Sequence, residues 1–190
     1  VNHDPTPLLL AIANLGVVTS YNTTLTADTQ PYYVHLRAVD RSGNWGAYRR
    51  YGPFTISASS SANYCVGATN STGVGAAITR TGGLSIGANN FVLRSTNLPN
   101  TGFALFIMAP SAGQSVLGDG FLCLSGTITR LGVAPISGGL SNFALNFNAA
   151  PVSTLIDAGE TWRFQTWFRD SIPGGAGYNL SNGLRVTFCE

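Results

Sequence analysis

The sequence predicts an all-β protein, and three observations lead to that fold class. Apolar and polar residues alternate over residues 142–148, 162–169 and 184–189, as in strands with one face in a core and the other in water. Glycine-rich turn signals separate such runs, at residues 42–44, 81–83, 99–102, 118–120, 137–139 and 173–175. No window of a dozen residues carries a helical stripe of apolar side chains. These patterns together favour a sandwich or a barrel of short strands.

The composition is typical of an extracellular β-protein. Of the 190 residues, 44% are hydrophobic and only 9% are charged, far below the roughly 25% charged residues of ordinary soluble domains. Serine, threonine, asparagine and glycine supply the polar surface instead. The chain begins at Val1 and shows no signal peptide, which predicts a processed piece of a larger secreted or cell-surface protein.

The distribution of charge and hydropathy excludes two classes of partner. The ten basic residues are all arginines, and apart from Arg49 and Arg50 they are scattered, whereas a nucleic-acid surface needs a clustered basic stripe. The longest apolar run, residues 103–109, has the length of a strand and is far shorter than the roughly 18 residues of a membrane span. We therefore expect neither nucleic-acid binding nor a membrane span.

A domain boundary is predicted at residues 57–62. This segment consists of serine and alanine only, and small residues with no apolar anchor form flexible linkers. The sequence thus predicts a first segment over residues 1–56, a linker over 57–62 and a complete domain over 63–190.

The first segment resembles the last three strands of a fibronectin type III-like domain. Residues 19–25, 30–40 and 52–56, with the turn at 42–45, carry the resemblance. Tyr32, Val34, Leu36 and Ala38 share one face, and Tyr32 stands where that family places its corner tyrosine. The resemblance implies that the early strands are missing. Because half a sandwich leaves its apolar face wet, we expect either strand complementation of this face by another chain or a remnant whose early strands were cut away.

The second segment resembles a module found at the extreme C-terminus of large secreted bacterial proteins. Residues 63–65, 118–123, 162–170 and 179–189 carry the resemblance as a set. In that family the module often follows Ig-like or repeat domains. The resemblance implies a β-sandwich accessory domain, which we expect to be jelly-roll-like, and it supplies no catalytic residue to carry over.

The three cysteines allow at most one disulfide within the chain. Cys65 opens the second segment and Cys189 closes it, and the first and last strands of a sandwich are often neighbours. We therefore expect a disulfide between Cys65 and Cys189. Cys123 lies in an apolar strand, where we expect a buried free thiol.

The reactive side chains are too few and too scattered for catalysis. Asp119 lies in one turn, and Asp157 and Glu160 flank another. At turns, acidic side chains commonly accept hydrogen bonds from the local backbone. Asp170 follows Arg169 at a strand end, which predicts a surface ion pair. Both histidines precede residue 57, and no two cysteine or histidine residues have the spacing of metal ligands. We expect a non-enzymatic protein with no catalytic residues, no metal and no cofactor.

Trp167 is the main candidate for ligand binding. Alternation places it on one face of a strand with Arg163 and Arg169, and Tyr178 follows in a glycine-rich loop. An indole beside planar donors can stack on a sugar ring. The favoured interpretation is that the arginines pack flat against the ring or that both faces of the strand are buried.

Two functions from different classes fit these patterns. The first is an extracellular structural or adhesive module that forms filaments or surface assemblies through strand complementation and self-association. The alternative is a carbohydrate-binding accessory module of a secreted hydrolase or adhesin.

Overall fold

The computed structural model describes residues 15–18, 20, 25, 28–56, 59–171 and 175–190, and the described part of the chain is all-β, as predicted. The chain divides into two compact units, which we call unit 1 (Val1–Ser57) and unit 2 (Ala58–Glu190). Each unit is described by itself.

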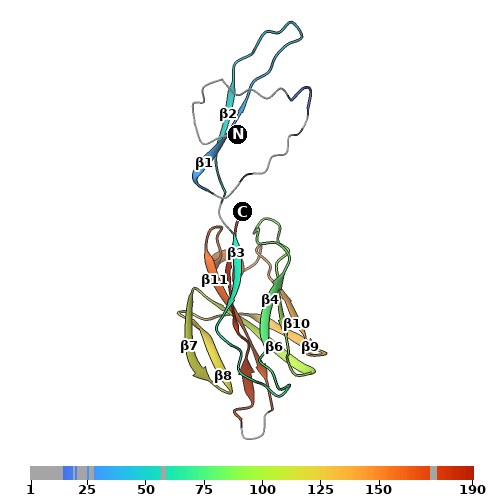
Figure 1. Ribbon diagram of the computed structural model, residues 1–190, viewed down its shortest axis with the longest axis vertical. Helices are drawn as coiled ribbons and strands as arrows, with labels where there is room; N and C mark the ends of the chain where they lie inside the picture. Colours follow the sequence, from blue (N-terminus) through green and yellow to red (C-terminus); the bar gives the residue numbers. More distant parts are fainter. Residues whose placement is uncertain (1–14, 19, 21–24, 26–27, 57–58, 172–174) are drawn as a thin grey trace. The chain divides into compact units, whose positions relative to one another are not determined.

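In the described part of unit 1, strands β1 (Asp28–Leu36) and β2 (Arg49–Ile56) form an antiparallel pair, drawn in blue and cyan in Figure 1. Tyr32 lies opposite Phe54 and Leu36 lies opposite Arg49, with register shifts between. The connection between the strands turns at Asp40, whose carboxylate accepts hydrogen bonds from the backbone N–H of Ser42 and Asn44 at 2.9 and 2.8 Å. Hydrogen bonds from Asn44 are the main cause that holds the pKa of Asp40 below its usual value.

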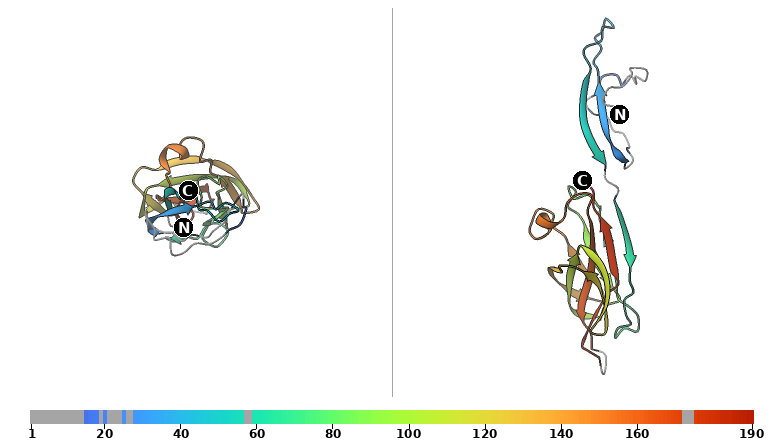
Figure 2. Two further views of the ribbon diagram at one scale, coloured as in Figure 1. Left: turned by 90° about the horizontal axis from the view of Figure 1, so that it is seen from above. Right: turned by 90° about the vertical axis from the view of Figure 1, so that its left-hand side faces the viewer.

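Unit 2 is built on two sheets and a hairpin. The larger sheet has the order β3-β13-β11-β6-β9, with β12 also paired to β11. Its strands are β3 (Ser60–Tyr64), β6 (Thr101–Ala109), β9 (Thr129–Ser137), β11 (Thr161–Arg169), β12 (Tyr178–Leu180) and β13 (Gly183–Thr187). The smaller sheet has the order β10-β5-β4, formed by β4 (Ala77–Thr81), β5 (Val92–Thr96) and β10 (Ser141–Ala144). The hairpin consists of β7 (Ser111–Leu117) and β8 (Gly120–Ser125), and α1 (Val152–Leu155) is the short orange coil at the side of the unit in Figure 2.

The linker predicted over residues 57–62 is wrong in its second half. Residues 60–62 belong to strand β3, which pairs with β13 along its whole length, from Ser60 opposite Thr187 to Tyr64 opposite Gly183. Small polar residues suffice there because β3 is an edge strand whose side chains are mostly exposed, so its pairing rests on backbone hydrogen bonds.

The main core lies on the inner face of the larger sheet, toward the smaller one. Phe91, Phe147 and Phe164 pack around Phe188, with ring centroids 5.2 Å apart for the first two and 6.2 Å for the third. Phe164 and Phe168 of β11 enter this core, as the alternation of that strand predicts. The inner face also carries one polar contact, between the hydroxyls of Thr166 and Ser95 at 2.5 Å.

Candidate functional site

The outer face of the larger sheet is partly covered by the β7–β8 hairpin. Ile107, Ala109 and Leu124 form a second apolar cluster there. Gln165, on the same face of β11, is fully buried and bonds β8: its amide accepts from the N–H of Cys123 at 2.9 Å and donates to the carbonyl of Phe121 at 2.7 Å. The hairpin therefore forms a third layer over part of the sheet.

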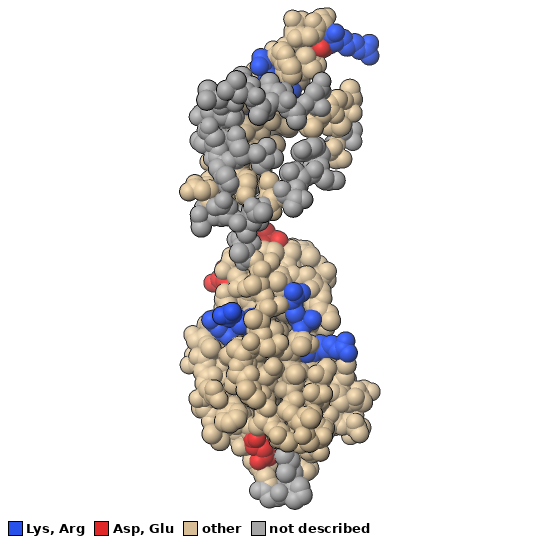
Figure 3. Space-filling view, viewed as in Figure 1, with Lys and Arg blue, Asp and Glu red and all other residues tan. Residues whose placement is uncertain are grey.

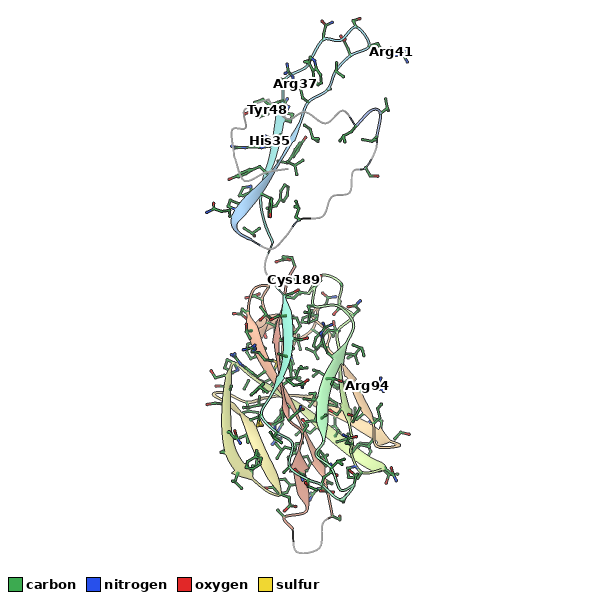
Figure 4. The ribbon with its side chains drawn as sticks, viewed as in Figure 1. His35, Arg37, Arg41, Tyr48, Arg94 and Cys189 are labelled. Carbon is green, nitrogen blue, oxygen red and sulfur yellow. A yellow bond between two sulfur atoms is a disulfide. The ribbon has the colours of Figure 1, made fainter. Side chains whose placement is uncertain are left out.

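The disulfide that fixes this layer joins Cys65 and Cys123. The predicted Cys65–Cys189 bridge and the predicted free thiol at Cys123 are both wrong. The first and last strands, β3 and β13, are indeed neighbours, but they run antiparallel, with Tyr64 opposite Gly183. Cys65 and Cys189 therefore lie at opposite ends of the pair, and Cys189 is a half-buried free thiol (Figure 4).

Tyr64 reinforces the same attachment. Its hydroxyl donates to the carbonyl of Cys123 at 2.8 Å. Burial raises the pKa of Tyr64 to about 12, against a smaller opposing effect of the Arg163 charge. The phenol therefore stays protonated and keeps its hydrogen bond throughout the neutral range.

The hairpin leaves the β6 and β9 side of the outer face open, and an apolar surface lies there. The register of the sheet places Leu105 opposite both Trp167 and Val133, and Phe103 opposite Pro135. Phe103 and Val133 are 64% and 60% exposed. We define the outer-face patch as the surface formed by Phe103, Leu105, Val133, Pro135, Trp167, Arg169 and Tyr178.

Arg169 stands at the centre of the outer-face patch. Continuing the β11–β6 register by one residue beyond Phe168 and Ala104 brings Arg169 opposite Phe103, and such cross-strand neighbours have Cβ atoms about 5 Å apart. The Arg169 guanidinium lies 5.5 Å from the centroid of the Trp167 ring. The predicted packing of Arg169 against this indole is thus present, and Trp167 is half-buried.

Tyr178 closes the other side of the outer-face patch. Its ring centroid is 5.6 Å from that of Trp167, with the planes tilted by 34°. Gly118, at the hairpin turn, lies against the Tyr178 ring so closely that a Cβ there would be 2.3 Å from a ring carbon. A glycine is therefore required at this contact.

Arg163, the fourth residue predicted to join this site, lies apart from it. It shares the outer face of β11 but stands opposite Ala109, toward the other end of the strand. Its guanidinium donates to the carbonyls of Pro110 and Thr161. Arg163 thus braces the start of β7 instead of contributing to the outer-face patch.

Sequence reasoning missed the apolar half of the patch. Phe103, Leu105, Val133 and Pro135 belong to strands β6 and β9, and the apolar run of residues 103–109 by itself predicts only a strand. Each strand could be predicted, but the order β9-β6-β11 that brings these residues beside Trp167 comes from long-range pairing. The uninterrupted apolar run of residues 103–109 is the one signal in the sequence that points to an apolar outer face, because it makes both faces of the strand apolar.

The carboxylates of unit 2 hold loops in place. Asp119 accepts hydrogen bonds from the N–H groups of Ala176 and Gly177 at 2.8 and 3.3 Å. Glu160 accepts from the N–H of Asp157 and from the indole N–H of Trp162, both at 3.1 Å. These contacts agree with turn chemistry of the kind expected at Asp119 and Glu160.

Asp170 departs from its predicted role. It is 1% exposed, and both carboxylate oxygens accept from the N–H of Ser71, at 3.1 and 3.2 Å. The prediction of a surface ion pair with Arg169 is therefore wrong. Arg169 points to the outer face, whereas Asp170 follows the end of the strand and ties the 70–73 turn to it.

The face predicted for strand complementation is covered unevenly. Tyr32 is buried at 7% exposure, Val34 is half-buried, and Leu36 and Ala38 are exposed. Other apolar side chains of unit 1 are exposed as well, namely Val39, Trp45, Tyr48, Tyr51 and Phe54.

Comparison with known proteins finds no match among family models, curated proteins or solved structures. The two resemblances stated from the sequence therefore stay predictions. Within the described ranges, no three His, Cys, Asp or Glu residues gather as metal ligands. None of the helices in the described part of the chain has the length and apolar character needed to cross a membrane.

Proposed function

We propose that this protein is a non-enzymatic, extracellular adhesive module that binds carbohydrate at the outer-face patch of unit 2. The observation that carries the proposal is the exposed ring of Phe103 on β6, the strand that pairs with β11, which carries Arg169. Carbohydrate binding is the alternative function that the sequence predicts, and the exposed side chains on one face of the larger sheet support it.

The chemistry of the patch suits a sugar. One face of a pyranose ring presents C–H groups that pack against an aromatic ring, while the hydroxyls around the ring need hydrogen-bond partners. Phe103 offers an exposed aromatic surface, and Arg169 offers planar N–H donors beside it. Pro135 and Val133, both exposed, extend the apolar floor. The linings of small-ligand sites likewise combine apolar side chains with a small number of placed polar groups.

The rest of the molecule supports a binding role outside the cell. The disulfide between Cys65 and Cys123 favours an oxidising compartment. The carboxylates of Asp119, Glu160 and Asp170 are engaged by backbone or indole N–H groups, which leaves them committed to structure and unsuited to paired acid–base work. Uncharged residues cover most of the face of unit 2 seen in Figure 3.

The test is a glycan array and a set of insoluble polysaccharides probed with the full chain and with Phe103→Ala. Because Phe103 is exposed, its truncation should leave folding intact and weaken binding about tenfold, the effect of losing one stacked ring. Tyr48→Ala is the matched control, because Tyr48 is an exposed aromatic residue of unit 1. A chain that binds no glycan, or that binds equally well as Phe103→Ala, would refute the proposal.

The second candidate is a structural subunit that assembles through unit 1. It is favoured by the exposed apolar side chains of the β1–β2 pair, since two strands alone are marginally stable and gain from further partners. The burial of Tyr32 within the chain weighs against it, because that residue needs no second chain to cover it.

A further inference from the structure

We infer that the ligand of the outer-face patch is an acidic polysaccharide, whose sugar carboxylate binds Arg169 while the sugar ring packs on Phe103. This inference rests on the proposed function and names the class of carbohydrate.

The guanidinium of Arg169 is available to a ligand. Arg169 is exposed, and among the described residues its guanidinium lies over the ring of Trp167 and donates no hydrogen bond. Unit 1 holds a similar pair, Arg37 over Trp45 at 5.4 Å, but there the arginine also donates to the carbonyl of Gly46 at 2.6 Å. Arg163, on the same strand as Arg169, is likewise engaged by backbone carbonyls. Arg169 therefore differs from both in keeping its donors uncommitted.

The indole of Trp167 prepares this group for an anion. Contact with a ring restricts the guanidinium before a ligand arrives, so less side-chain entropy is lost on binding. A planar guanidinium can present two parallel N–H donors. That fork matches the two oxygens of a carboxylate better than it matches a single hydroxyl.

Among the described residues, no carboxylate accepts a hydrogen bond from Arg169, although Asp170 and Asp119 both lie near it in the chain or in the fold. Asp170, next in the chain, is buried and bonded to Ser71. Asp119 accepts from Ala176 and Gly177. Arg130, which stands opposite Ile107 on the edge strand β9, adds a second exposed positive charge to the same sheet. The outer face therefore carries uncommitted positive charge and complements an anionic chain.

The apolar floor selects a sugar as the carrier of that carboxylate. Phe103 directly precedes Ala104, the β6 partner of Phe168, and is mostly exposed. Cross-strand neighbours have Cβ atoms about 5 Å apart, so one ligand residue can reach both Phe103 and Arg169 if the register continues. A uronic acid has a carboxylate on a ring carbon and a C–H face on the same ring. It therefore satisfies the guanidinium and the phenyl ring together.

The experiment compares one polymer in two charge states. Polygalacturonate and its fully methyl-esterified, neutral form are titrated against the full chain at about 0.15 M salt, where long-range attraction is largely screened. We expect the acidic form to bind at least tenfold more tightly. Arg169→Gln should remove that preference, and Arg169→Lys should keep only part of it, because lysine lacks the planar fork.

The controls separate a specific site from general charge. Arg94→Gln removes an exposed arginine of the smaller sheet and should preserve the preference. Thermal unfolding of each variant shows whether it folds. Equal affinity for the two forms, equal loss in Arg94→Gln, or tighter binding of a sulfated neutral-backbone polymer would overturn the inference. If the two forms bind equally and Phe103→Ala still weakens both, the proposed function holds and only the acidic class fails.

Discussion

In strand β11, the alternation of apolar and polar residues predicts which side chains face the core, but it does not predict the burial of every polar residue. Trp162, Phe164 and Phe168 face the core as the period-two pattern predicts. Gln165 lies on the opposite face, where the pattern predicts contact with water, yet it is fully buried. Its amide bonds Cys123, Phe121 and Ser181, so it joins β11 to the hairpin and to the end of β12.

Gln165→Leu should therefore destabilise unit 2 strongly. The substitution keeps the side-chain volume similar but leaves the Cys123 N–H and two carbonyls without partners, which costs about 2–4 kcal/mol in the free energy of unfolding. Urea denaturation followed by tryptophan fluorescence measures this loss. Gln114→Leu, at an exposed position of β7, serves as the control and should change the free energy of unfolding by less than about 0.5 kcal/mol. Equal effects of the two substitutions would contradict the structural role of Gln165.

At the scale of elements, the β7–β8 hairpin explains the largest corrections. The sequence predicts its turn at residues 118–120 but contains no signal that it folds over the larger sheet. Because the hairpin lies over the larger sheet, Cys123 is the cysteine that pairs with Cys65, and Gln165 is buried. The hairpin also covers only part of the outer face and leaves the rest open. Gly118 and Asp119 at its turn also hold Tyr178 and the loop before it.

Removing the disulfide should loosen this hairpin. The bridge spans 58 residues, and the chain-entropy relation gives a loss of about 4 kcal/mol when it is absent. The double substitution Cys65→Ala with Cys123→Ala should lower the midpoint temperature of unfolding accordingly. The backbone amides of β7 and β8 should then exchange with deuterium before those of the other strands of unit 2. Cys189→Ala, which removes the free thiol, should retain the hairpin protection of the unmodified chain. Unchanged exchange in the double variant would show that the hairpin does not depend on the bridge.

At the scale of the whole molecule, the two units differ in how completely they bury apolar residues. Unit 2 buries two clusters between its layers. Unit 1 keeps Leu36, Tyr51 and Phe54 exposed on a two-stranded sheet. Apolar side chains on a small sheet favour association with another surface.

If unit 1 assembles with a second copy, the full chain should sediment as a concentration-dependent dimer or larger species. Leu36→Asp with Tyr51→Asp places charges on exposed apolar positions of both strands and should return the chain to a monomer. Val116→Asp, at an exposed apolar position of unit 2, should leave association unchanged. Sedimentation velocity distinguishes these outcomes, and a monomer at all concentrations would remove the structural candidate.

The sequence by itself determined the all-β class and the inward-facing residues of β11, because these follow from local alternation and from turn residues. Only the tertiary structure decided the disulfide, the burial of Gln165 and Asp170, and the joining of Phe103 to Arg169 in one surface. Each of these depends on which strands lie side by side and in which direction. That order is set by packing between residues far apart in the chain, which no local pattern records.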